Sequence, residues 1–206
     1  VGYDLLIRLI QLLTSSYGTD TRITSIVNNT EIWINPLVNP DGYVLQQRYN
    51  AAGIDLNRNF PMPSGEQHPD GEDWGVENVA FMNFSQTKHF IQSINYHGGA
   101  LVMNYPWDYT YSLAPDDALL QSMALTYSTP YTAMYNGEFD QGITNGAAWY
   151  VITGSFQDWN YGYTDCIDIT CEVSSIKWPA ANTLDSYWNQ NRESILSYME
   201  YAQKGL

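Results

Sequence analysis

The sequence predicts one α/β domain in which helices cover a largely parallel or mixed β-sheet. Segments with helical and with strand periodicity alternate along the 206 residues, and no internal repeat or linker divides them. Apolar residues make up 44% of the chain and charged residues 15%, a composition typical of globular rather than disordered proteins. A chain of this length can bury a substantial core as a single domain.

Four segments are expected to be helices. Leucine and isoleucine recur at helical spacing in residues 3–18, and Gly18 is a typical residue for the end of a helix. The last segment, residues 186–204, is amphipathic in the same way. Residues 76–88 and 116–128 complete the set.

Three segments are expected to be strands, namely residues 31–35, 90–97 and 168–174. Residues 39–75 and 136–165 are expected to be long loops, the first rich in Asn, Pro, Gly and Asp and the second rich in aromatic residues. Loops of this length in a compact domain are usually functional or disordered. In α/β sheets, binding sites form in the loops that follow strand ends.

The charge of the chain argues against two classes of partner. Only 8 Lys and Arg accompany 22 Asp and Glu, which gives a formal net charge of −14. So few cations build no basic patch, and we therefore expect neither nucleic acid nor a membrane surface as a partner. The negative field favours cationic substrates, although such a charge also serves solubility alone. No apolar run approaches the roughly 20 residues that span a bilayer.

The two cysteines, Cys166 and Cys171, lie five positions apart in a stretch with strand character. Residues at an odd spacing in a strand point to opposite faces, so these two cannot form a disulfide with each other. We expect both to be buried small residues.

Two residues at strand ends are candidates for chemistry. His97 precedes a Gly-Gly pair, which lets a ligand approach closely, and imidazole is the commonest side-chain metal ligand. Glu172 follows apolar strand residues, where a carboxylate is costly unless it is paired or lies in a cleft. Taken singly, His97 also fits a packing histidine and Glu172 a salt bridge at a strand end.

The loop at 39–75 holds two of the eight cationic side chains, Arg48 and Arg58. A guanidinium binds a carboxylate through two parallel hydrogen bonds, and Asn57 offers an amide donor beside it. Together with Asp55 these residues resemble a polar pocket more than a solvated surface. Tyr150 lies between glycine-containing segments that suggest a mobile loop, although it also fits a packed tyrosine.

Read in order, five blocks resemble the zinc metallocarboxypeptidases, most closely the regulatory subfamily of carboxypeptidases N, E, M and D. The resemblance covers nearly the whole chain and implies a three-layer α/β/α sandwich with a mixed, mainly parallel twisted sheet. The blocks are NPDGY (39–43), GIDLNRNFP (53–61), NYHGGALVMNYPWD (95–108), GITNGAAWY with GSFQDWNY (142–161) and ITCEVSSIKWP (169–179).

The resemblance implies roles in catalysis for four residues. His97 matches the third zinc ligand, and Asp55 matches an acid that orients a zinc-bound histidine. Glu172 matches the general base that takes a proton from a zinc-activated water. Arg48 matches the arginine that polarises the scissile carbonyl and stabilises its oxyanion.

Five further residues are implied to bind the substrate. Asn57 and Arg58 match the pair that holds the terminal carboxylate of a peptide, and Tyr150 matches the tyrosine that closes over it. Asp108 and Gln157 match positions that line the pocket for the terminal side chain. In the regulatory subfamily, an acid and a glutamine there select C-terminal Lys or Arg, so the implied activity is that of an exopeptidase for basic C-terminal residues.

One part of the family's zinc site is not found in the sequence. The family binds zinc through two histidines and a glutamate, and the first two ligands come from a His-x-x-Glu motif just before the first helix. Here Gly71 stands at that spacing after His68, and Gln92 after His89. The family's first helix begins where Val1 begins, so the motif is expected a few residues upstream.

We therefore expect residues 1–206 to be one metallocarboxypeptidase catalytic domain whose N-terminal part is missing. On its own the chain is expected to be inactive, because two zinc ligands are absent, and loss of an N-terminal strand would expose a sheet edge. Two alternatives stay open. A protein that naturally lacks the motif would be a non-catalytic domain that binds peptide C-termini, and a related zinc hydrolase would act on other C-terminal amides.

The resemblance also implies a cofactor, partners and a location. One Zn²⁺ is expected in the complete protein, with peptide or protein C-termini as binding partners. A secreted or periplasmic location is expected because bacterial members of the family are mostly exported, although no signal peptide is visible in this sequence. The oligomeric state does not follow from the sequence, and a monomer is the expectation.

Overall fold

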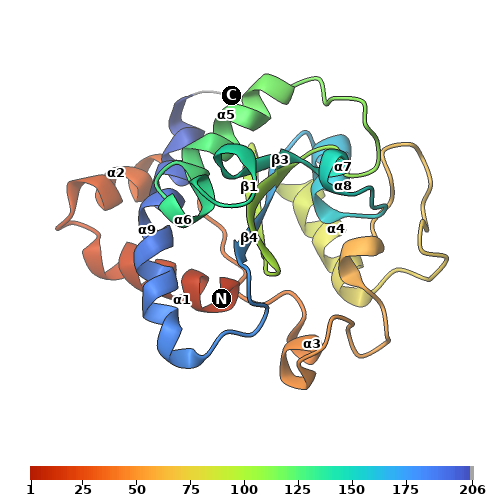
Figure 1. The fold of residues 1–206 in the computed structure, drawn as a ribbon, viewed down its shortest axis with the longest axis horizontal. Coiled ribbons are helices and arrows are strands. Elements are labelled where there is room, and N and C mark those ends of the chain that lie inside the picture. Colours follow the sequence, from red (N-terminus) through yellow and green to blue (C-terminus); the bar gives the residue numbers. More distant parts are fainter. Residues whose placement is uncertain (205–206) are drawn as a thin grey trace.

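A mixed sheet of four strands lies at the centre of the computed structural model, which describes residues 1–204 (Figure 1). The strands run in the order β1 (Gln92–His97), β4 (Ile167–Ser174), β2 (Ala100–Tyr105) and β3 (Ile143–Asn145). β1 is parallel to β4 and β2 is parallel to β3, whereas β2 and β4 are antiparallel. The sheet is therefore mixed and mainly parallel, as expected.

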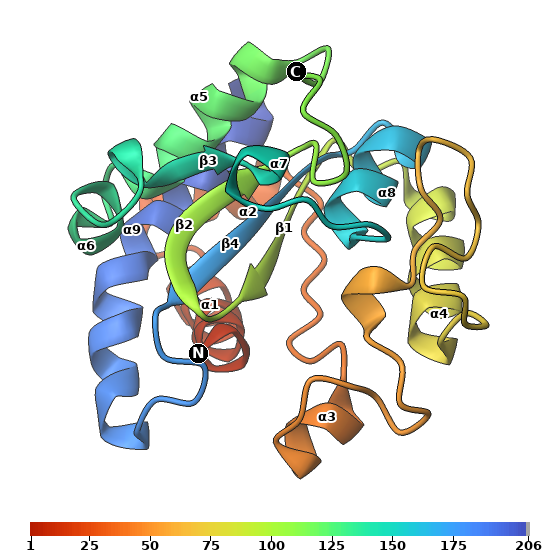
Figure 2. The same ribbon diagram turned by 45° about the vertical axis from the view of Figure 1, so that its right-hand side comes forward.

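Helices cover both faces of this sheet (Figure 2). On one face α5 packs on β2, α9 packs on α5 and α1, and α2 packs on α1, whereas on the other face α8 packs on β4 and α4 on α8. The expected helices near 3–18, 76–88, 116–128 and 186–204 are confirmed. The six longer helices within residues 1–204 are α1 (Gly2–Ser16), α2 (Thr21–Asn29), α4 (Val76–Lys88), α5 (Asp117–Ser128), α8 (Phe156–Thr164) and α9 (Leu184–Tyr201).

Both expected long loops contain short helices. The first includes α3 (Pro40–Leu45) and a 3-10 turn at Leu56–Arg58, and the second includes α7 (Gly146–Trp149) and the whole of α8. The remaining short elements are α6 (Thr132–Tyr135) and 3-10 turns at Asp140–Gly142, Ala181–Thr183 and Ala202–Lys204. α8 begins at Ser155, whose hydroxyl accepts the N–H of Asp158, a capping pattern that the aromatic composition of the segment obscured.

The expected strand at residues 31–35 is wrong. Ile32 and Ile34 pack against the core while the residues between and beside them are exposed, so the alternation of a strand is present. Within residues 1–204, however, no strand pairs with this segment, and β1 pairs with β4 alone. Apolar residues at every second position show only which side of an extended segment is buried. A β-strand also requires a neighbouring strand that pairs with its backbone N–H and C=O groups.

The main core lies between the sheet and the layer of α1, α5 and α9. Leu5, Leu9 and Leu13, four residues apart on one face of α1, are buried against it. Cys166 and Cys171 are both buried and free, as predicted. No helix within residues 1–204 is long and apolar enough to cross a membrane.

The opposite face of β1 and β4 is polar. The register pairs Ser93 with Asp168, and Asn95 with Thr170. Asp168 is fully buried, and its carboxylate accepts hydrogen bonds from the Ser93 hydroxyl, from Asn95 Nδ2 at 2.7 Å and from Asn160 Nδ2 at 3.2 Å. Burial raises the pKa of Asp168 to about 6, although these hydrogen bonds oppose the shift.

We predict that Asp168 makes stability depend on pH. The folded protein holds this proton more tightly than the unfolded chain does, so the stabilisation is complete below pH 3.8 and is lost as the pH rises through about 6. The loss amounts to about 3 kcal/mol in the free energy of unfolding. Urea unfolding of the wild type and of Asp168→Asn between pH 4 and pH 8 measures it, since the other acids are common to both proteins. If the free energy of unfolding changed with pH in the same way in both proteins, the prediction would be contradicted.

Candidate active site

His97 and Glu172 lie side by side at one end of the sheet. They are register partners in the parallel pair of β1 and β4, so their side chains point to the same face, which is the polar one. Gly98 and Gly99 then carry the chain across the end of β4 to β2, and the N–H of Gly99 donates to the carbonyl of Ser174 at 2.7 Å. Gly99 has φ +142°, a conformation that favours glycine.

The two groups have strongly shifted acidities. Burial lowers the pKa of His97 to about 4, and the nearby charges of Arg48 and Arg58 act in the same direction. Burial raises the pKa of Glu172 to about 7, against the positive charges of Arg48 and Lys177. His97 is therefore a neutral imidazole at neutral pH, and Glu172 can both take and give a proton there. The Oε2 atom of Glu172 has no hydrogen-bond partner within residues 1–204.

Arg48 and Asp55 form a two-pronged ion pair at the edge of this site. Nε and NH2 of Arg48 lie 2.9 Å from the two carboxylate oxygens of Asp55. Asp55 also accepts the N–H of Asn57 at 3.1 Å and so begins the 3-10 turn. Within the described part of the chain Asp55 thus contacts an arginine, and no hydrogen bond joins it to His97.

Asn57 and Arg58 are fixed by the start of α8. Asn57 Oδ1 accepts the N–H of Phe156 at 2.8 Å, which leaves its amide Nδ2 as the remaining donor. A Cβ atom at Gly154 would collide with the carbonyl oxygen of Arg58, so this close approach requires glycine. The guanidinium of Arg58 donates to the carbonyl of Asn57 at 2.7 Å, and no carboxylate pairs with it within residues 1–204.

Asp108 and Gln157 are buried next to Arg58. Asp108 is 2% exposed and accepts a hydrogen bond from Asn104 Nδ2 at 3.0 Å. Burial raises the pKa of Asp108, while the charge of Arg58 lowers it. Gln157 Oε1 accepts the N–H of Thr170 at 3.0 Å, and its Nε2 has no partner within the described residues.

Tyr150 lies outside this cluster. It follows α7, is 47% exposed, and its ring packs edge-on against Trp149 at 4.8 Å between centroids. No side-chain hydrogen bond holds its phenol within residues 1–204. The structure places His97, Glu172 and Asp108 within range of the charges of Arg48 or Arg58, whereas a role for Tyr150 stays a prediction.

Three neighbours of the site were missed by sequence reasoning. Lys177 lies over the Gly98–Gly99 turn, with Cε 3.2 Å from the position of a Cβ at Gly99. Asn104 holds the carboxylate of Asp108, and Asp158 accepts main-chain N–H groups of residues 108 and 109. The S-x-x-D spacing at 155–158 could have indicated the start of α8, but nothing in the sequence indicated what Asp158 would contact.

The described residues do not fit a zinc site by themselves. Within residues 1–204 no group of three or more His, Cys, Asp or Glu could hold a metal ion. His68 binds the carbonyl of Glu72 through Nδ1 and stacks on Trp74, and His89 ends α4. His97 is thus a single candidate ligand.

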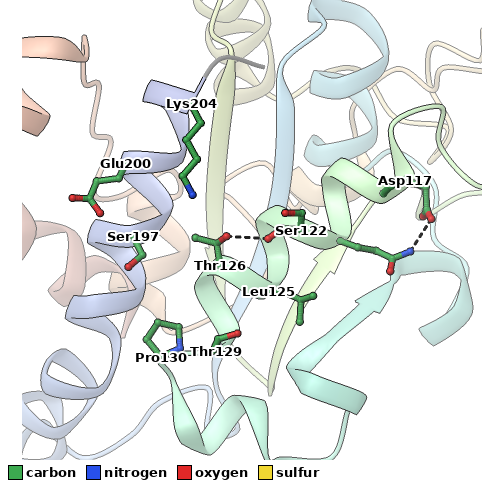
Figure 3. Close-up of a pocket in the computed structure, with 11 residues that line it drawn as sticks. Asp117, Ser122, Leu125, Thr126, Thr129, Pro130, Ser197, Glu200 and Lys204 are labelled. Atoms are coloured by element: carbon green, nitrogen blue, oxygen red, sulfur yellow. Dashed lines mark hydrogen bonds between the residues drawn. The ribbon is translucent and has the colours of Figure 1, made fainter.

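A separate groove of about 790 Å³ lies between α5 and α9 (Figure 3). Its wall includes Ser122 and Thr126 from α5 and Ser197 and Glu200 from α9. None of the candidate site residues lines it.

Comparison with known proteins identifies the family of the chain. The family model described as zinc carboxypeptidase matches residues 1–194. Carboxypeptidase D of Mus musculus is 40% identical over 231 aligned residues, which cover all of this chain and 17% of that protein. Carboxypeptidase M of Mus musculus is 36% identical over 231 residues, covering all of this chain and 52% of that protein. The chain thus spans between about a sixth and about half of these relatives.

Solved structures with low sequence identity share the fold. Bovine thrombin-activatable fibrinolysis inhibitor, in complex with tick carboxypeptidase inhibitor, superposes with a TM-score of 0.79 at 18% identity, over all of this chain and 80% of that one. A metallo-carboxypeptidase from Pseudomonas aeruginosa, in complex with (2-guanidinoethylmercapto)succinic acid, gives 0.66 at 15% identity, over 98% and 53%. With the family model matched over residues 1–194, the chain belongs to the zinc carboxypeptidase family.

Proposed function

We propose that this chain contains the substrate-binding residues and the general base of a carboxypeptidase that removes C-terminal Lys or Arg from peptides. One observation carries the proposal. An arginine without a carboxylate partner in the described structure, Arg58, lies within electrostatic range of a buried carboxylate, Asp108. A C-terminal Lys or Arg offers the complementary pair, an α-carboxylate and a cationic side chain.

The proposed binding mode uses five residues. Arg58 and Asn57 hold the terminal carboxylate, because they supply a guanidinium with unused N–H donors and the amide Nδ2 of a neighbouring residue. Asp108 receives the basic side chain, and the nearby Gln157 lines the same pocket. Tyr150 covers the bound carboxylate. Only a chain end carries a free α-carboxylate next to the scissile peptide bond, so this arrangement gives an exopeptidase rather than an endopeptidase.

The proposed proton transfers belong to Glu172. With a pKa of about 7 it accepts a proton from the attacking water and returns it to the leaving amine. Arg48 faces both His97 and Glu172 and stabilises the oxyanion of the tetrahedral intermediate. The family's zinc requires ligands besides His97, and residues 1–204 do not provide them. The isolated chain is therefore expected to bind peptides without hydrolysing them.

The relatives support this assignment of substrate class. The Pseudomonas aeruginosa structure holds a ligand with a guanidino group and two carboxyl groups, which is the chemistry that Asp108 and Arg58 would bind. The relatives with 36–40% identity are named carboxypeptidases D and M. Residues 1–206 are proposed to be one catalytic domain of the three-layer α/β/α type, secreted or periplasmic and monomeric.

A second candidate is a non-catalytic domain that binds peptide C-termini. One observation favours it. Asn57 and Arg58 are available to bind a carboxylate, whereas no cluster of metal ligands is found within residues 1–204. The third hypothesis, a zinc hydrolase for other C-terminal amides, is less favoured because Asp108 and Gln157 suit a basic side chain.

We predict that binding requires a free terminal carboxylate and Arg58. The chain should bind acetyl-Ala-Ala-Ala-Arg at least about tenfold more tightly than its C-terminal amide, since charged hydrogen bonds contribute about 1.5–3 kcal/mol. Arg58→Ala should remove this difference, whereas Arg192→Ala, at an exposed arginine outside the site, should keep it. Titration calorimetry or NMR measures the six affinities, those of the three proteins for the acid and for the amide. Equal affinity for the acid and the amide in the wild type would contradict the proposal.

A second prediction concerns Asp108. Asp108→Asn should lower the affinity for acetyl-Ala-Ala-Ala-Arg on the order of tenfold, because the guanidinium of the peptide loses its counter-charge. The affinity for acetyl-Ala-Ala-Ala-norleucine, whose terminal side chain is uncharged, should stay nearly unchanged. The same titrations test this, with the amide forms as controls for the carboxylate contact. A uniform loss for both peptides would show that Asp108 only supports the fold.

A further inference from the structure

Asp158 is a buried carboxylate without a cationic partner in the described structure. It is 3% exposed and lies in the first turn of α8, where the helix dipole favours negative charge. Both of its oxygens accept the main-chain N–H of Asp108, at 2.9 and 3.0 Å, and Oδ2 also accepts the N–H of Tyr109 at 3.1 Å. No Lys, Arg or His pairs with it within residues 1–204.

These bonds fix the backbone that carries Asp108. Asp158 holds its N–H, the N–H of Ile152 donates to its carbonyl at 3.1 Å, and Asn104 holds its side chain at 3.0 Å. A Cβ at Gly146 would collide with Asp108 Oδ1, so the glycine provides the space that the Asp108 side chain occupies. Asp108 is thus anchored from α8, from the segment after α7 and from β2.

The carboxyl groups of Asp158 and Asp108 lie within electrostatic range of each other. Burial raises the pKa of Asp158 well above its usual value, and the charge of Asp108 adds to the shift. Asp168 lies close enough to act on Asp158 in the same direction, and Arg58 acts on Asp108 in the opposite one. Two adjacent carboxyl groups keep a negative charge in the pocket even when one of them holds a proton.

We propose that Asp158 is a positioning and specificity-determining residue that acts through Asp108 on the cationic side chain of the ligand. It aligns the main chain at residues 108–109 and thereby sets the position of the Asp108 carboxylate that meets the ligand. The inference rests on the proposed function, because it assumes that Asp108 faces a Lys or Arg side chain. It assigns no contact between Asp158 and the ligand.

The test compares acetyl-Ala-Ala-Ala-Arg with acetyl-Ala-Ala-Ala-norleucine on the full chain. Asp158→Asn keeps the shape of the side chain and one oxygen for the N–H groups but replaces the other accepting oxygen with an NH₂ donor. We expect the ratio of the two affinities to fall on the order of tenfold, with the affinity for the norleucine peptide nearly unchanged. Asp165→Asn, an exposed aspartate at the end of the same helix, makes the same change in net charge and should leave the ratio unaltered.

A double-mutant cycle separates action through Asp108 from a general effect. In the Asp108→Asn background, Asp158→Asn should cause no further loss of preference for arginine. If Asp158→Asn does not fold, the ¹³C signal of the Asp158 carboxyl in the wild type decides the question. It should shift when the arginine peptide binds and stay in place when the norleucine peptide binds.

Three results overturn the inference. A folded Asp158→Asn with an unchanged ratio, an equal loss for both peptides, or a carboxyl signal that ignores the arginine peptide would each do so. If the wild type prefers the arginine peptide and one of these three results is found, only the inference about Asp158 is contradicted and the proposed function is retained. Failure of the wild type to bind either peptide at millimolar concentration contradicts the proposed function and removes the inference with it.

Discussion

The register between β1 and β4 is the constraint on which the rest of the site depends. It pairs three polar residues of β1 with three polar residues of β4, and the last pair is His97 with Glu172. The alternate residues of β4, Ile169, Cys171 and Val173, are fully buried on the other face. A slip by one residue would turn these apolar side chains outward, so the packing of the core also fixes the place of the two candidate catalytic groups.

The second constraint is the contact between α8 and the loops before it. Asn57 accepts the N–H of Phe156, and Asp158 accepts the N–H groups of residues 108 and 109. One helix start thereby joins the loop that carries Arg58 to the turn that carries Asp108. The segments that carry Arg58 and Asp108 are thus held apart by buried side chains, Asn57 and Asp158, that accept main-chain N–H groups.

Much of the fold could be predicted from the sequence because its elements carry strong local signals. The helix at residues 2–16 follows from leucines at helical spacing, and the strand at 167–174 follows from β-branched residues between turns. The segment at 31–35 has equally clear alternation, yet pairing depends on a neighbouring strand that no local pattern specifies. α8 was missed because aromatic, amide and glycine residues dominate its sequence and its capping serine is a weak local signal.

Much of the candidate site was predicted, but its contacts were not. His97, Glu172, Arg58 and Asp108 were proposed from the sequence, and their roles stay predictions. The structure places His97 and Glu172 within range of the charge of Arg48, and Asp108 within range of that of Arg58. Two contacts were not predicted, the ion pair of Asp55 with Arg48 and the hydrogen bonds of Asp158 to main-chain N–H groups. Both depend on how distant segments pack. The residue types in a motif indicate which chemistry is possible. The hydrogen-bond partner of a buried carboxylate, in contrast, depends on which main-chain segment the fold places next to it.

The most direct test of the account is a crystal structure of this chain with acetyl-Ala-Ala-Ala-Arg bound. The account predicts that the terminal carboxylate lies within hydrogen-bond distance of the Arg58 guanidinium and the Asn57 amide, with the ligand's guanidinium against Asp108. A peptide bound with its C-terminus away from Arg58, or with its arginine side chain in solvent, would contradict the account.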